Sequence, residues 1–344
     1  MKAAPLVLAG QEIKPGERTT IDIPITAMVT NHDMRMTVHV IHSRKPGPTL
    51  FVSAAIHGDE INGVEIIRRL LRQKQLSRMS GTLIAVPIVN VHGFLSYSRY
   101  LPDGRDLNRS FPGSKTGSLA ARTAHAFLNG IVKKATHGID LHTGSRHREN
   151  LPQIRANLSN EKVKAMALAF GCPAIINSKL RDGSLRESAD DLGIPILLYE
   201  AGEALRFDET SIRAGVRGIL NVMRHLEMLS SKNKSAKNPG KPVLTSATNW
   251  IRAPHSGITR TLVSLGSQVK RGDVLGVIAD PLGYTDFGVI APNDGIVIGR
   301  NNLPIVHEGD ALIHLANYAT QLDAAAEQVE SFQENLADTP GKMI

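Results

Sequence analysis

The sequence predicts an α/β fold, with a mostly parallel mixed sheet flanked by helices and a small all-β domain after it. Continuous apolar runs such as TLFVSAAI (49–56) are typical of strands buried on both faces of a sheet. These runs alternate with segments of helical apolar spacing, which indicates parallel strands joined by crossover helices. Beyond residue 242 the pattern changes to short β-type runs punctuated by glycine and proline.

The elements are expected in the following order. Two extended segments in 19–42 alternate apolar and polar residues around a turn at 31–33. The strand 49–56 leads into a helix at 61–75, whose arginines lie on the outer face. Further strands are expected at 82–89, 137–142, 173–178 and 195–200, and further helices near 117–135, 159–170, 184–192 and 208–229.

Composition divides the chain into four parts. Residues 1–230 form the α/β domain, with β segments at its start. Residues 231–242 are small, polar and basic with two prolines, which is typical of a solvated linker. Residues 243–316 form the all-β domain, which is similar to the barrel-sandwich hybrid fold of biotinyl and lipoyl carriers. Residues 317–344 are expected to be a marginal helix or a loose tail.

Composition also narrows the class of protein. Of the 344 residues, 42% are hydrophobic and 21% charged, which excludes a disordered chain, and the single cysteine, Cys172, excludes an internal disulfide. No apolar run is long enough to span a bilayer, and the first ten residues are too weakly apolar for a secretion signal. We therefore expect a cytoplasmic protein without a membrane partner. The oligomeric state stays open, a homo-oligomer included.

The net charge of +8 first suggests an anionic or nucleic-acid partner. However, the five basic residues in 66–80, where there is no acid, and the four lysines of the linker together exceed this surplus. Aromatic residues make up only 4% and form no base-stacking cluster. We therefore expect no nucleic-acid binding, and recognition of a carboxylate-bearing ligand would depend on a few placed arginines.

Two strand ends carry candidate metal ligands. His57 ends the strand 49–56 and Glu60 follows on the first helical turn, where ligands bind in open α/β sheets. His142 ends the strand 137–142, and Asp140, two residues earlier, shares its face and can orient the imidazole. Two histidines and a glutamate form a ligand set of catalytic zinc. The alternative is a helix-start carboxylate beside polar loop histidines, with Asp140 bonded to a loop backbone.

Two further segments contain candidate catalytic or substrate-binding residues. Glu200 ends an apolar strand, where a carboxylate can move the proton of a zinc-activated water; the alternative is a surface ion pair with Arg206 or Arg213. The loop 98–113 follows the strand 82–89 and carries three arginines, which can bind a carboxylate or hold an oxyanion. Taken alone, such a loop is more often a salt-bridged turn.

Four motifs occur in order: HGDE (57–60), SRYLPDGRDLNRSFPG (98–113), DLHTG (140–144) and YEAGE (199–203). Together they resemble the succinylglutamate desuccinylase/aspartoacylase family, a branch of the zinc carboxypeptidase superfamily. The resemblance covers about 45–230 and then the C-terminal module. It implies a zinc hydrolase that removes an acyl group from the amine of an amino acid.

The resemblance also implies roles for single residues. It assigns one zinc ion to His57, Glu60 and His142, and the role of general base to Glu200. Asn108 and Arg109 would hold the substrate carboxylate, and Arg99 would polarise the scissile carbonyl. Because the spacing from Arg99 to Asn108 is longer than the family pattern, Arg105 stays a rival for the oxyanion role. Arg186 lies where related enzymes bind an acidic group, and a solvated helix charge is an equal alternative.

The C-terminal module has two similar half-motifs, APHSG (253–257) and APNDG (291–295). The stretch between them lacks the lysine of a true carrier, so attachment of biotin or lipoyl is not expected. Comparable domains in related deacylases shape access to the active site. The sequence thus predicts a zinc-dependent deacylase of a small N-acyl amino acid. The alternatives are a metallocarboxypeptidase that cleaves a short peptide and a metal- or ligand-binding protein without turnover.

Overall fold

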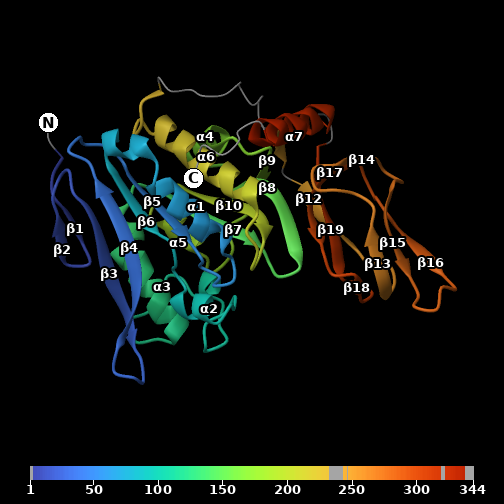
Figure 1. The fold of residues 1–344 in the computed structure, drawn as a ribbon, viewed down its shortest axis with the longest axis horizontal. Helices are drawn as coiled ribbons and strands as arrows, with labels where there is room; N and C mark the ends of the chain where they lie inside the picture. The colour runs from blue at the N-terminus through green and yellow to red at the C-terminus, as the bar shows by residue number, and fades with distance from the viewer. Residues whose placement is uncertain (1–2, 232–242, 246, 319–321, 338–344) are drawn as a thin grey trace.

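The computed structural model describes residues 3–231, 243–245, 247–318 and 322–337. Its centre is a large mixed sheet flanked by helices, with a second, smaller sheet at the end that is far from the N-terminal strands (Figure 1). The strands of the large sheet follow the spatial order β12 (Ala247–Arg252), β19 (Ala311–Asn317), β17 (Gly295–Asn301), β8 (Arg148–Ala156), β10 (Ile196–Glu203), β7 (His137–Gly144), β5 (Thr49–Ala54), β6 (Thr82–Val86), β4 (Asp33–His42) and β3 (Arg18–Ala27). The predicted α/β fold class is confirmed.

The four strands at the centre, β6, β5, β7 and β10, run parallel, as their apolar sequences predict. Antiparallel neighbours flank them, β4 beside β6 and β8 beside β10. Three short strands extend the sheet: β9 (Ala174–Asn177) pairs with β8, β11 (Val243–Thr245) with β9, and β14 (Gln268–Val269) with β17. A separate hairpin joins β1 (Leu6–Leu8) and β2 (Gln11–Ile13). Because parallel strands end at the same edge, the polar residues after β5, β7 and β10 come together there.

The sequence pattern does not predict β8. Its sequence, RENLPQIRA, contains a proline and several polar residues, which argue against a central strand. The polar residues of β8 instead line or support the cavity described below. This strand therefore carries more of the site than its composition suggests.

Helices cover both faces of the sheet. Leu50, Val52 and Ala54 on β5 pack against α1 (Asn62–Leu71), α4 (Glu161–Phe170) and α6 (Glu209–His225). The opposite face holds Phe51, which contacts Phe127 of α3 (Leu119–Gly130) with ring centroids 6.0 Å apart. On this face lies also α5 (Leu185–Asp191). The shorter helices are α2 (Val91–Leu95), η1 (Lys74–Arg78), η2 (Leu107–Arg109) and η3 (Val132–Lys134).

The C-terminal region is built of strands, as predicted for 243–316. An antiparallel sheet has the order β16 (Asp286–Ile290), β15 (Val274–Ala279), β13 (Gly257–Thr261) and β18 (Ile305–Val306). Strand β17, however, pairs with β8, so β12, β19 and β17 continue the large sheet. The C-terminal strands therefore reach the polar residues of β8.

The predicted tail 317–344 contains α7 (Leu322–Ala337). Val329, Phe332 and Leu336 on this helix are buried, so it packs on the body of the molecule. The rest of that tail beyond 337, and the linker from 232 to 242, lie outside the described residues. In the part of the chain that the structure describes, no helix has both the length and the apolarity to cross a membrane.

Candidate active site

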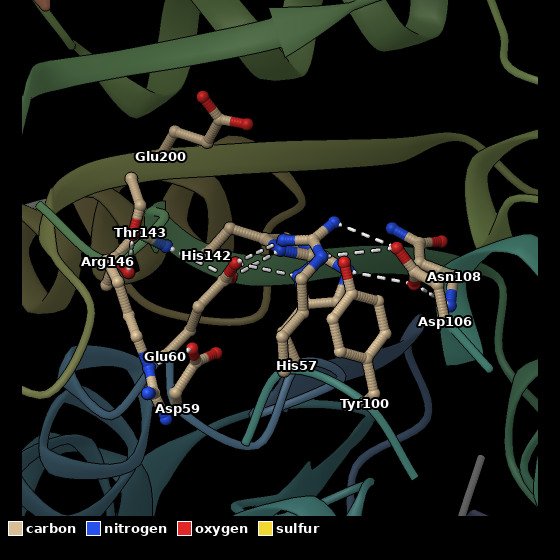
Figure 2. A network of polar contacts seen from close by, with 12 residues as sticks. His57, Asp59, Glu60, Tyr100, Asp106, Asn108, His142, Thr143, Arg146 and Glu200 are labelled. Carbon is tan, nitrogen blue, oxygen red and sulfur yellow. Dashed lines mark hydrogen bonds and ion pairs between the residues drawn. The ribbon is translucent and has the colours of Figure 1, made fainter. Parts of the chain in front are cut away.

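His57, Glu60 and His142 meet at the edge of the parallel strands. His57 follows β5, Glu60 precedes α1, and His142 lies on β7, the neighbour of β5. All three are buried, and their candidate ligand atoms lie within 4.8 Å of one another. Glu60 joins the two imidazoles: its Oε1 lies 2.7 Å from His57 Nδ1 and its Oε2 lies 2.7 Å from His142 Nδ1. Figure 2 shows this cluster between Asp106 and Asn108 on one side and Asp59 and Arg146 on the other.

A second carboxylate lies behind each imidazole. His142 Nε2 contacts Asp140 Oδ2 at 2.7 Å, and His57 Nε2 contacts Asp106 Oδ1 at 3.1 Å. Ser53 Oγ donates to the other oxygen of Asp140 at 2.7 Å and holds it in place. Because a carboxylate accepts the proton of each Nε2, both Nδ1 atoms are available to bind a cation. Asp140 was predicted for this position from the sequence, whereas Asp106, two residues before Asn108, was missed.

In this cluster, burial and charge interactions shift the pKa values of the side chains in opposite directions. Burial lowers the pKa of His142, but the carboxylates of Asp140 and Glu60 outweigh it and raise the pKa well above its usual range. Burial raises the pKa of Glu60, but the two imidazoles outweigh it and bring the pKa far below its usual range. Glu60 is therefore ionised at neutral pH. Two imidazoles and one ionised carboxylate, with Nε2 of each ring already occupied, form a donor set that fits Zn²⁺.

The cluster forms one end of a cavity of about 280 Å³. Its lining is strongly basic, because the acidic residues on it are Glu60 and Glu200 whereas six arginines line it. These arginines are Arg99, Arg109, Arg148, Arg155, Arg181 and Arg186. Only two of them come from the loop 98–113, so distant segments supply most of the charge.

The loop 98–113 brings Arg99, Asn108 and Arg109 to the cavity. Arg99 is ion-paired with Glu60 at 3.3 Å and with Asp106 at 3.0 Å, which places its guanidinium beside the candidate metal ligands. The backbone N–H of Leu185 donates to Asn108 Oδ1 at 2.9 Å, which leaves the amide nitrogen for a ligand. Arg105 lies elsewhere: its side chain is 59% exposed and lies 3.8 Å from Asp103.

Glu200 lies on β10 and lines the same cavity. In the parallel pairing of β10 with β7 its register partner is His142. Its carboxylate is ion-paired with Arg155 at 2.9 Å and accepts a hydrogen bond from Asn150 at 3.1 Å. Its ion-pair partner is thus Arg155, whereas the alternative interpretation from the sequence names Arg206 or Arg213. One of those, Arg213, is ion-paired with Glu209 at 2.6 Å.

Arg186 lies on α5 and is buried, with 6% of its surface exposed. Its guanidinium donates to Ser178 Oγ at 3.4 Å and to the Lys179 carbonyl at 3.2 Å. Burial lowers the pKa of Arg186, and the nearby Arg155 lowers it further, against the opposing effect of Glu200. The alternative of a solvated helix charge is therefore wrong for Arg186. Its hydrogen-bond partners are neutral, so its charge can serve a ligand.

The C-terminal strands contribute an aromatic side chain to the cavity, which the sequence does not predict. Trp250 on β12 lines the cavity. The Trp250 ring stacks on the imidazole of His314 of β19, with the two ring centroids 4.6 Å apart. The guanidinium carbon of Arg148 lies 5.4 Å from the centroid of the Trp250 ring. Trp250 is the single tryptophan of the chain, but its sequence neighbours carry no signal of a site. Only the pairing of β12, β19, β17 and β8 places it there.

Residues 46–226 match the family model of the succinylglutamate desuccinylase/aspartoacylase catalytic domain. A deacetylase of N-alpha-acetyl-L-2,4-diaminobutyric acid from Halomonas elongata is 27% identical over 290 residues, covering 81% of this chain and 85% of that protein.

Two solved structures are similar over nearly the whole chain. A succinylglutamate desuccinylase/aspartoacylase from Rhodobacter sphaeroides has a TM-score of 0.76 and 25% identity, covering 88% of this chain and 95% of its own. The ectoine utilization protein EutE (DoeB) of Ruegeria pomeroyi, in its product-bound form, has a TM-score of 0.78 and 22% identity. This likeness covers 92% of this chain and 98% of the other.

Proposed function

Because the chain belongs to the succinylglutamate desuccinylase/aspartoacylase family, we propose that it is a zinc-dependent deacylase that hydrolyses the amide bond of a small N-acyl amino acid. The observation that supports this most directly is the buried His57, Glu60 and His142 cluster at the end of a basic cavity. The Halomonas relative is named as a deacetylase of an N-acetyl amino acid, which agrees with this reaction class.

One zinc ion would be held by Nδ1 of His57, Nδ1 of His142 and the carboxylate of Glu60. A zinc ion in such a site lowers the pKa of a water and polarises a carbonyl group. Asp106 and Asp140 would keep the two imidazoles in the orientation and tautomer that binding needs. Arg99 is ion-paired with both Glu60 and Asp106 and lines the cavity, so it places a positive charge beside the proposed metal ligands.

Glu200 is the proposed general base and acid. It takes a proton from the attacking water and returns it to the nitrogen of the leaving amine when the amide bond breaks. Its position on a strand beside that of His142 supports this role, because backbone pairing fixes it next to the metal ligands.

The arginines of the cavity are the proposed anion sites. Arg99 would hold the oxyanion that develops on the amide carbonyl, and we assign this role to Arg99 rather than to the exposed Arg105. Asn108 and Arg109 would bind the α-carboxylate of the amino acid. Arg186 would bind a second anionic group, on the side chain or on the acyl group. The six arginines favour such a substrate over one with a cationic side chain.

The experiment is a deacylation screen of the zinc-loaded protein. N-acetyl, N-succinyl and N-formyl derivatives of acidic, neutral and basic amino acids are incubated with it, and the released amine is measured. Short peptides with a free carboxyl end are the comparison. We expect cleavage of one or more acyl amino acids. Faster cleavage of the peptides would show a carboxypeptidase, and the absence of cleavage would contradict the enzymatic function.

A further inference from the structure

Asn150 connects the proposed general base to the C-terminal strands. It lies on β8, only 7% of its surface is exposed, and its Nδ2 donates to Glu200 Oε2 at 3.1 Å. Arg155, on the same strand, is ion-paired with the same oxygen at 2.9 Å. Since both contacts fall on Oε2, Oε1 is the oxygen left to exchange a proton with water and with the amine.

We propose that Asn150 is a positioning residue for Glu200, and that Gly299 of the C-terminal strands keeps Asn150 in place. This inference rests on the proposed role of Glu200 as the base.

The backbone register brings the three residues together. Asn150 is the partner of Gly299 on β17 and of Gly202 on β10. A register shift between Glu200 and Gly202 interrupts the pairing of β10 with β8. Glu200 itself is the partner of Gln153, so its side chain reaches Asn150 diagonally along the strand. The hydrogen bond from Asn150 therefore acts together with the Arg155 ion pair to hold the carboxylate toward β8.

Because Gly299 has no side chain, it leaves space for the side-chain amide of Asn150. A Cβ atom at this position would lie 2.9 Å from Asn150 Oδ1 and 3.2 Å from His314 Cβ. The φ of Gly299 lies outside the left-handed region, so an added side chain meets this steric contact and no left-handed backbone strain. An alanine would push the Asn150 amide away from its position beside Glu200. Strand β17 thus contributes to catalysis through Asn150.

Steady-state kinetics with the acyl amino acid that the unmodified protein cleaves fastest test this inference. In Asn150→Ala we expect kcat to fall about 10- to 100-fold with KM nearly unchanged, because a donor to a charged group is lost. Asn150→Asp keeps the shape but repels Glu200, so it should lose at least as much activity.

Gly299→Ala should also lower kcat. The double variant should be no worse than Asn150→Ala, because both changes act on one contact. Gly288→Ala is the matched control, since Gly288 is an exposed strand glycine of β16 where an added Cβ would meet only the flexible end of Ile290. Its kinetics should stay unchanged, as should the metal content of every variant.

Three kinetic results would overturn the inference. More activity in Asn150→Asp than in Asn150→Ala would show that only the shape of the side chain matters. A raised KM with unchanged kcat would make Asn150 a substrate contact. Additive losses of kcat in the double variant would show that Gly299 acts independently of Asn150.

Two further measurements separate this inference from the proposed function. A crystal structure of Gly299→Ala needs no substrate: an amide displaced from Glu200 supports the inference, and an amide still within hydrogen-bonding distance refutes it. Glu200→Gln is assayed beside the other variants. Full activity of Glu200→Gln would refute the proposed base and this inference with it. An inactive Glu200→Gln with a normal Asn150→Ala would refute only the positioning role.

Discussion

Glu200 on β10 lies directly opposite His142 on β7 in the parallel pairing of the two strands. The proposed base and a proposed metal ligand are therefore joined by backbone hydrogen bonding at the centre of the sheet. Both strands are largely buried, so their relative position depends on the core rather than on loops. A site built in this way is held in place before substrate arrives, which is what precise proton transfer needs.

Asp106 should control metal binding through His57. In Asp106→Asn the Nε2 of His57 loses its carboxylate, so we expect the affinity for zinc to fall about 10- to 100-fold. Competition with a chromophoric chelator measures this affinity. In His57→Ala, binding of one zinc ion per chain should be lost altogether. Asp103→Asn, in the same loop, is the control, because Asp103 contacts Arg105 and the backbone of Ala120 instead of a metal ligand. Equal losses in both Asp variants would refute the role of Asp106.

Zinc binding should weaken as the pH falls. The carboxylates of Glu60, Asp106 and Asp140 raise the pKa of His57 and His142 against the lowering effect of burial, so a cation must displace protons from these rings. Zinc affinity should therefore rise with pH until the raised pKa values are passed. Isothermal titration calorimetry in buffers of different ionisation enthalpy measures the released protons. An affinity that does not change with pH would contradict the ligand assignment.

Arg99 and Arg105 can be distinguished by paired variants. Arg99→Met removes the guanidinium beside Glu60, and we expect kcat/KM to fall about 100- to 1,000-fold, as for the loss of an oxyanion donor. Arg105→Met changes an exposed side chain outside the cavity and should leave the kinetics within about two-fold. The opposite result would assign the oxyanion role to Arg105.

Arg186 should select the charge of the substrate. In Arg186→Met we expect kcat/KM for substrates with a second carboxylate to fall about 100-fold, because that carboxylate loses the buried cation that would bind it. Substrates with a neutral side chain and acetyl group should be affected much less. Circular dichroism and thermal unfolding check that the variant is folded. Equal losses for both substrate classes would contradict selection by Arg186.

The sequence predicts the central part of this fold well, because its signals are local. Buried strands such as 49–56 are continuous apolar runs, and His57 and Glu60 stand where such a strand ends. Part of the charge pattern is also explained locally: Arg68 on α1, whose side chain is 52% exposed, is ion-paired with Glu65 three residues earlier.

The rest of the site depends on long-range pairing. Asn150 and Arg155 lie on β8, whose proline and polar residues hide the strand in the sequence. Trp250 reaches the cavity only because β12, β19 and β17 join the sheet beside β8. The choice between Arg99 and Arg105 depends on the path of the loop, which residue spacing alone does not determine.

Zinc titration of the metal-free protein, with Glu200→Gln measured beside it, tests the central claim most directly. Amine release from the best acyl amino acid is followed as zinc is added, together with the bound metal per chain. The proposed function predicts that activity rises to a plateau at one zinc ion per chain. It also predicts that Glu200→Gln binds the same zinc with turnover lowered about 100- to 10,000-fold. Amine release that is independent of zinc, or full turnover in Glu200→Gln, would contradict the account.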